Sequence, residues 1–150
     1  MTFSLLDRSN YLRGLLILIG KDRKITREEK ILFRKLSKEL GFNKEFCENA
    51  LKEYLVNKYL NIDPPKFSDI EIAKLFIQDG IKLAFADKEL NHYEIGWLKS
   101  VADTNKINHN WSLEQYKKYY NNFENLDGEF EITKFLNKYA QITVTSQTVK

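Results

Sequence analysis

The sequence has one cysteine, two prolines and six glycines among its 150 residues. A single cysteine, Cys47, excludes an intrachain disulfide framework, and we expect it to be a buried structural thiol in a reducing compartment. So few prolines and glycines argue against a turn-rich β-sandwich and against disorder. The longest apolar run covers residues 15–19, whereas a membrane-spanning helix needs roughly 20 apolar residues. We therefore expect a cytoplasmic protein without a secretory leader.

The charge balance is nearly even, with 24 basic and 21 acidic residues and a formal net charge of +3. A mixed surface of this kind is not the basic field of a sequence-specific nucleic-acid binder. Hydrophobic residues make up 43% of the chain and aromatic residues 13%. That content is enough to build the core of one domain over residues 1–150.

The chain nearly repeats itself. Residues 8–54 align without a gap on residues 73–119, a shift of 65 positions. The matching pairs include Tyr11 and Phe76, Leu16 and Ile81, Asp22 and Asp87, Thr26 and Asn91, and Glu29 and Glu94. The alignment predicts that one helix–acidic turn–helix unit is present twice.

Apolar residues recur at spacings of three and four along most of the chain, which indicates helices. No period-two strand pattern is present outside the C-terminal tail, 141–150, which we expect to fray or to lie along the bundle. The sequence therefore predicts an all-α, single-domain bundle of about seven helices built from two pseudo-symmetric three-helix units. The expected helices cover residues 10–21, 26–40, 43–59, 68–86, 91–104, 110–122 and 129–139.

Polar residues mark the expected helix starts. The predicted N-caps are Asn10, Thr26, Asn43, Ser68 and Asn91. Three of them have a glutamate three residues later, which predicts a capping box: Thr26 with Glu29, Ser68 with Glu71, and Asn91 with Glu94. Gly41 is expected just after the end of the second helix.

The helical spacing also predicts which side chains face the core. In the third and fifth helices, Phe46 and Ile95 are expected to pack inward. In the sixth, Tyr116 and Tyr120 are expected to face the core, with Tyr119 at its edge. The alternative for these tyrosines is stacking on a ligand.

The two acidic turns allow two interpretations. In the local one, the acidic residues only cap the following helices and favour their positive ends. In the other, the turns bind a divalent cation such as Ca²⁺, which takes 6–8 oxygen ligands. The candidate ligands are Asp22, Glu28 and Glu29 in one turn and Asp87, Glu89 and Glu94 in the other. Neither turn offers enough ligands alone, so strong binding requires that the two turns lie close together.

The stretches LLILIGKDRKITREE at 15–29 and KLAFADKELNHYE at 82–94 resemble the TerB-like tellurite-resistance family. The resemblance covers about residues 10–110 and implies a helical bundle in the bacterial cytosol with a stress-response role near the membrane. It also implies metal binding through Asp22, Glu29, Asp87 and Glu94. The family's glycine after each aspartate is replaced by Arg23 and Lys88, and a positive charge there opposes cation binding.

Basic residues form a stripe along the second helix, at Arg27, Lys30, Arg34 and Lys38. Such a stripe is either a solvated helix face or a contact for an anionic partner, such as lipid headgroups or phosphate. His92, inside the second acidic turn, is either an exposed first-turn residue or an additional metal ligand.

These patterns predict a non-enzymatic, TerB-like sensor or adaptor in the cytoplasm, peripheral to the inner membrane. Its expected partner is a protein, membrane-associated in one version of the hypothesis, and the chain would be a monomer or a homodimer. The first alternative is a plain protein-interaction domain whose acidic residues are only helix caps. A metal-dependent hydrolase is the least favoured alternative, because the sequence has only two histidines and no paired nucleophile and base.

Overall fold

The protein is described by a computed structural model that places residues 3–20, 25–56, 62–85, 91–121 and 130–138. Every regular element in these ranges is a helix, so the all-α prediction is confirmed. None of the placed helices is long and apolar enough to cross a bilayer. The helices are α1 (Leu5–Ile19), α2 (Arg27–Glu39), α3 (Lys44–Val56), α4 (Ile70–Ala84), α5 (His92–Thr104), α6 (His109–Asn121) and a last helical segment at 131–138.

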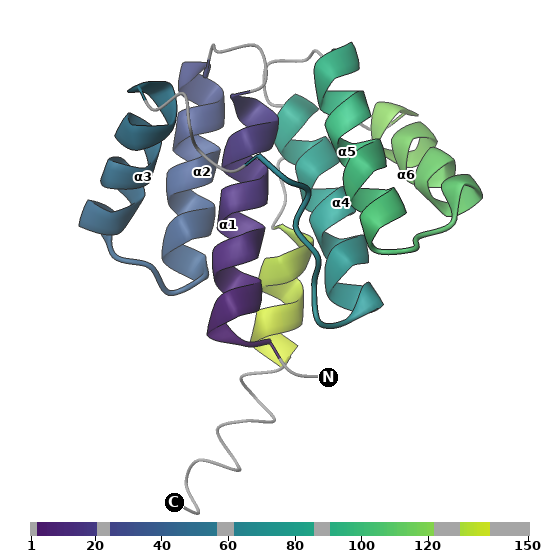
Figure 1. The fold of residues 1–150 in the computed structure, drawn as a ribbon, viewed down its shortest axis with the longest axis horizontal. Helices are drawn as coiled ribbons and strands as arrows, with labels where there is room; N and C mark the ends of the chain where they lie inside the picture. Colours follow the sequence, from purple (N-terminus) through teal and green to yellow (C-terminus); the bar gives the residue numbers. More distant parts are fainter. Residues whose placement is uncertain (1–2, 21–24, 57–61, 86–90, 122–129, 139–150) are drawn as a thin grey trace, which may run out of the picture.

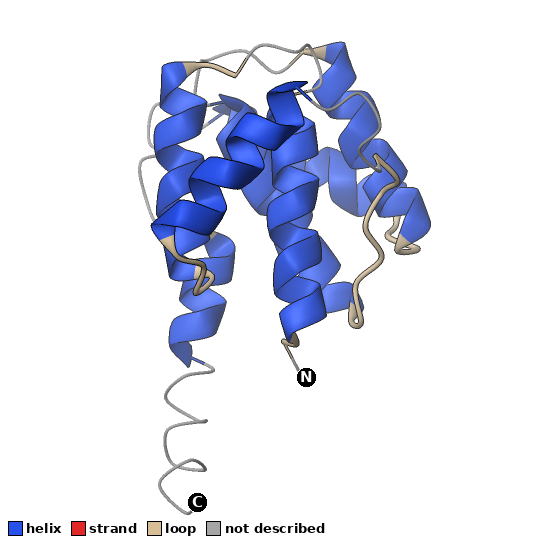
Figure 2. Cartoon of the chain, turned by 60° about the vertical axis from the view of Figure 1, so that its left-hand side comes forward, coloured by secondary structure: helices blue, strands red, loops and turns tan. Residues whose placement is uncertain are grey.

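The first six helices repeat at the same interval as the sequence. α4, α5 and α6 begin and end 65 residues after α1, α2 and α3, respectively. α1 and α4 lie side by side at the centre, α2 and α5 flank them, and α3 and α6 are outermost (Figure 1). The turned view in Figure 2 shows the described part of the chain as packed helices joined by loops.

Two of the predicted capping boxes are confirmed. Thr26 Oγ1 accepts from the Glu29 N–H at 3.1 Å, and the Thr26 N–H donates to Glu29 Oε1 at 2.9 Å. Asn91 and Glu94 make the equivalent pair at 2.9 and 3.2 Å. Asn43 also caps α3 as predicted, since its Oδ1 accepts from the Phe46 N–H at 2.7 Å.

Two predicted caps are wrong. α1 begins well before Asn10, at a capping box made by Ser4 and Asp7. The N-cap of α4 is Asp69, whose side chain accepts from the Glu71 N–H at 2.8 Å. Ser68 instead donates its N–H and its hydroxyl to the Asp7 carboxylate, at 3.0 and 2.5 Å. This contact with α1 leaves the capping position to the next residue.

Three predictions of inward-facing side chains are also wrong. Phe46 is 48% exposed, Ile95 42% and Tyr120 67%. The order of the tyrosines in α6 is reversed, because Tyr119 is buried and Tyr116 only partly buried. Phe46 and Tyr120 belong to the outermost helices, which have neighbours on one side only (Figure 1).

Equivalent turns end α2 and α5. Gly41, at φ 92°, donates to the Lys38 carbonyl while Phe42 donates to the Ser37 carbonyl, both at 3.0 Å. This is the Schellman arrangement, in which the residue after the cap is left-handed. Lys106, at φ 57°, occupies the same place after α5. A side chain in this conformation costs free energy that glycine does not incur.

These turns predict opposite effects of two substitutions. Gly41→Ala is expected to lower the free energy of unfolding by about 1 kcal/mol, and Lys106→Gly to raise it by about 0.5–1 kcal/mol. Urea denaturation of both variants and the parent protein measures the effects. A loss of stability in Lys106→Gly would contradict the assignment of backbone strain to that residue.

Candidate functional site

The structure places half of the proposed metal ligands. Asp22, Asp87 and Glu89 lie outside the described residues. Glu28 is exposed in the first turn of α2. The remaining two candidate ligands, Glu29 and Glu94, are placed at the starts of α2 and α5.

Glu29 and Glu94 are both buried, at 3% and 4% exposure. Each directs its Oε1 to the N–H of its own N-cap residue. Both glutamates therefore have the capping role that the local interpretation requires.

The helix ends that flank the two acidic turns lie at the same end of the bundle (Figure 1). α1 and α4 run in the same direction, and α2 and α5 start where these two helices finish (Figures 1 and 2). The segments that carry the two acidic turns, residues 21–24 and 86–90, lie outside the described residues. In the placed ranges, no three His, Cys, Asp or Glu side chains are grouped as metal ligands. His92 is exposed, with its ring centroid 4.1 Å from that of Tyr93.

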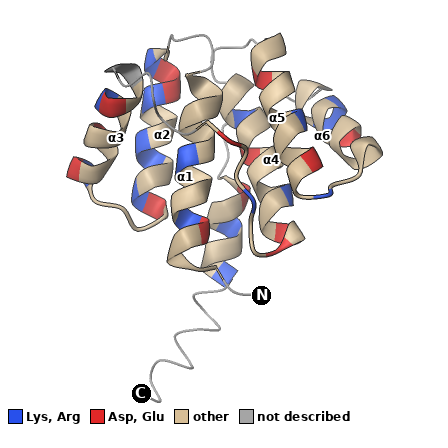
Figure 3. Cartoon of the chain, viewed as in Figure 1, with Lys and Arg blue, Asp and Glu red and all other residues tan. Residues whose placement is uncertain are grey.

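The predicted basic stripe follows α2 (Figure 3). Arg27 and Lys38 are exposed and Lys30 is half-buried. Arg34 is paired with Glu48 of α3, with Nε 2.6 Å from Oε1 and Nη2 3.3 Å from Oε2. These hydrogen bonds lower the pKa of Glu48. All four cations of the stripe therefore have solvent-accessible surface, and Arg34 is also tied to the neighbouring helix.

Cys47 is buried in α3, as predicted. Desolvation raises the pKa of its thiol. A raised pKa disfavours the thiolate, so the environment suits a structural residue better than a nucleophile.

Asp79 is a buried carboxylate of α4 that was not among the candidate residues predicted from the sequence. It is fully buried and accepts three hydrogen bonds. The donors are the Tyr11 hydroxyl at 2.6 Å, the Glu131 N–H at 2.6 Å and the Ile132 N–H at 2.9 Å. Asp79 thus caps the last helical segment from a distant position in the chain.

A second layer of contacts surrounds Asp79. Lys82 donates to Glu131 Oε1 at 2.9 Å, and the Tyr119 hydroxyl donates to the same oxygen at 3.3 Å. Burial raises the pKa of Asp79 to about 6, against the opposing effects of its hydrogen-bond donors and of the Lys82 charge. The sequence does contain a signal for this buried carboxylate: Asp79 lies at helical spacing from Ile72, Phe76 and Leu83, on the apolar face of α4.

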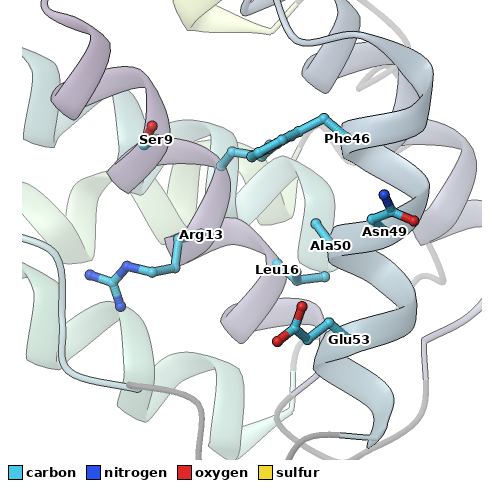
Figure 4. A pocket seen from close by; sticks show the side chains of 8 residues that line it. Ser9, Arg13, Leu16, Phe46, Asn49, Ala50 and Glu53 are labelled. Carbon is cyan, nitrogen blue, oxygen red and sulfur yellow. The ribbon is translucent and has the colours of Figure 1, made fainter.

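An apolar groove lies between α1 and α3 (Figure 4). Its volume is about 380 Å³, and Phe46 extends across it from α3 towards α1. We call it the α1–α3 groove. It is lined by Ser9, Leu12, Arg13, Leu16, Phe46, Asn49, Ala50 and Glu53.

Comparisons of this chain with protein-family models, with curated proteins and with solved structures find no match. The TerB-like resemblance therefore stays a prediction.

The buried carboxylate predicts a pH-dependent stability. The pKa of the Asp79 carboxyl is about 6 in the folded protein and about 3.8 when the group is exposed. The folded protein therefore binds this proton more tightly than the unfolded chain does. As a result, the contribution of Asp79 to the free energy of unfolding falls as the pH rises between these values. Relative to Asp79→Asn, the parent protein is expected to lose about 2 kcal/mol of unfolding free energy between about pH 4.5 and pH 7.5.

Urea denaturation of both proteins at the two pH values measures this difference, and the subtraction removes the contribution of all other carboxylates. A difference that does not change with pH would show that Asp79 does not titrate in this range.

Proposed function

We propose that this chain is a non-enzymatic adaptor whose α1–α3 groove binds an amphipathic helix of a partner protein. The observation that supports the proposal is apolar surface left uncovered along the groove. Phe46 is 48% exposed although it stacks on Phe42 at a centroid distance of 4.8 Å. Leu5, 72% exposed, continues the same face of α1 as Ser9 and Leu12.

The shape of the groove suits a helix. Its walls are helices of 15 and 13 residues, which are about 20 Å long. An amphipathic helix binds such a groove with apolar side chains spaced by three, four and seven residues. The polar side chains of Ser9 and Asn49 among the lining residues provide contacts for the edge of such a ligand.

A second candidate function is the cation-responsive, TerB-like sensor in the bacterial cytosol. It is supported by the helix ends that flank the two acidic turns, which lie at the same end of the bundle (Figure 1). In this version the cation would bridge the turns through Asp22 and Asp87 and stabilise the folded protein. The stress-response setting and the location beside the inner membrane belong to this proposal.

Selection from a display library of amphipathic helical peptides, about 15 residues long to match the groove, tests the adaptor function. We expect enriched peptides whose affinity falls at least about tenfold, or 1.4 kcal/mol, in Phe46→Glu, because a carboxylate in the groove opposes apolar contacts. Tyr120→Glu, which changes an exposed aromatic residue of α6, is the matched control and is expected to keep the affinity. Failure to enrich any peptide, or equal loss in both variants, would reject the groove.

Thermal unfolding in the presence of Ca²⁺, Mg²⁺, Mn²⁺ or Zn²⁺ tests the cation sensor. A ligand at 100 times its dissociation constant stabilises the folded state by about 2.7 kcal/mol. Asp22→Asn/Asp87→Asn is expected to abolish the shift in melting temperature, whereas Glu114→Gln, at an exposed acidic residue of α6, preserves it. No shift in millimolar metal, or the same shift in the double variant, rules out this function.

A further inference from the structure

A second cavity, of about 470 Å³, lies between α2 and α3. We call it the α2–α3 cavity. We propose that it binds a phosphate group, either as a free anion or as part of a larger molecule. It is lined by Arg34, Ser37, Lys38, Phe42, Asn43, Lys44, Cys47 and Glu48.

The charges in this cavity are mostly positive. Three of the lining residues are cations and one, Glu48, is an anion. Arg34 already pairs with Glu48 across the two helices. Lys38 and Lys44, both exposed at the opening, therefore leave an excess of positive charge. Arg and Lys side chains bind phosphate through charge-assisted hydrogen bonds.

Ser37 supplies a buried polar group at the wall of the cavity. Its side chain is 1% exposed, and in the part of the chain that the structure describes its hydroxyl has no oxygen or nitrogen partner. A hydrogen bond from Ser37 opposes the rise in the pKa of the Cys47 thiol, but sulfur is a weak acceptor. A buried hydroxyl without a partner costs free energy, and a phosphate oxygen in the cavity would remove that cost.

The start of α3 adds a favourable dipole. Asn43 and Lys44, at the N-terminal end of this helix, both line the cavity. Asn43 satisfies the Phe46 N–H, while the N–H groups before it have no partner within the helix. Helix N-termini bind anions through such groups and through the helix dipole.

The second copy of the repeat shows that the fold does not require this chemistry. Ser37 and Lys38 correspond to Ala102 and Asp103, 65 residues later. Asp103 lies 3.1 Å from the Nε2 atom of His109, the counterpart of Lys44. The equivalent region of the second copy carries a carboxylate in place of the Lys38 charge, although it does contain an unpartnered hydroxyl, at Ser112, the counterpart of Cys47. The excess of positive charge is therefore what is particular to the first copy.

A titration with inorganic phosphate, followed by ¹⁵N–¹H NMR at constant ionic strength, tests the proposal. We expect saturable shifts of the Ser37, Lys38 and Lys44 amides. Lys38→Asp, which copies the second repeat, is expected to weaken binding at least about tenfold, and Ser37→Ala to weaken it as well. Lys35→Asp is the matched control, because Lys35 is exposed on the same helix but does not line the cavity. It is expected to keep the affinity within about twofold.

Vesicle sedimentation identifies the source of the phosphate. Binding to vesicles containing phosphoinositides that is lost in Lys38→Asp and kept in Lys35→Asp supports a lipid headgroup. Phosphate binding with no binding to these vesicles supports a free or small-molecule phosphate. Shifts that do not saturate, or equal losses in Lys38→Asp and Lys35→Asp, would overturn the proposal, because they indicate only a diffuse attraction to the charge of α2.

Discussion

The packing of α1 against α4 is the contact on which the rest of the bundle depends. It is close because Gly14 has no side chain: a Cβ atom there would lie 2.7 Å from Phe76 Cζ, well inside contact distance. The Trp97 indole N–H donates to the buried carbonyl of Gly14 at 3.1 Å and ties α5 to the same point. α2 and α5 pack against this central pair, and α3 and α6 complete the flanks. A larger residue at Gly14 would separate the two three-helix units, and every outer contact would have to adjust.

The parts of the fold that the sequence predicted are those fixed by neighbours in the chain. The Thr26 and Asn91 caps join a side chain to an N–H three residues away, so no distant residue decides them. The start of α4 is different, because Ser68 and Asp69 are both good caps. Asp7, 61 positions before Ser68, takes the serine hydroxyl and so decides between them. The exposure of Phe46 was not predictable for the same reason. The spacing of apolar residues around Phe46 predicts a helix, but it does not predict how many other helices pack against that helix.

The candidate sites were predictable to a similar extent. The basic stripe on α2 was visible because it lies within one helix, and Arg34 and Lys38 of that stripe reach the α2–α3 cavity. The contribution of Lys44 was not visible, because it depends on how α3 folds back on α2. Asp79 was overlooked because its three donors come from α1 and from a segment more than 50 residues away. A buried carboxylate is satisfied only by such distant groups when its own helix offers none.

The last helical segment explains why the two copies differ at their centre. It lies close to the central pair, α1 and α4 (Figure 1). Because the described residues contain one such segment, its N-terminal N–H groups need a capping residue from one copy of the repeat and not from both. In the second copy Asp79 receives its N–H groups, whereas in the first copy the equivalent position is Gly14, which allows the close approach of Phe76. An aspartate at position 14 as well as at position 79 would bury a second carboxylate without hydrogen-bond donors. A glycine at both positions would leave the last helical segment without its N-terminal cap. A difference between equivalent positions of the two copies therefore indicates an interaction that one copy makes and the other does not. By the same reasoning, the positive charge at Lys38, which Asp103 replaces in the second copy, is a property of the first copy alone and not of the shared fold.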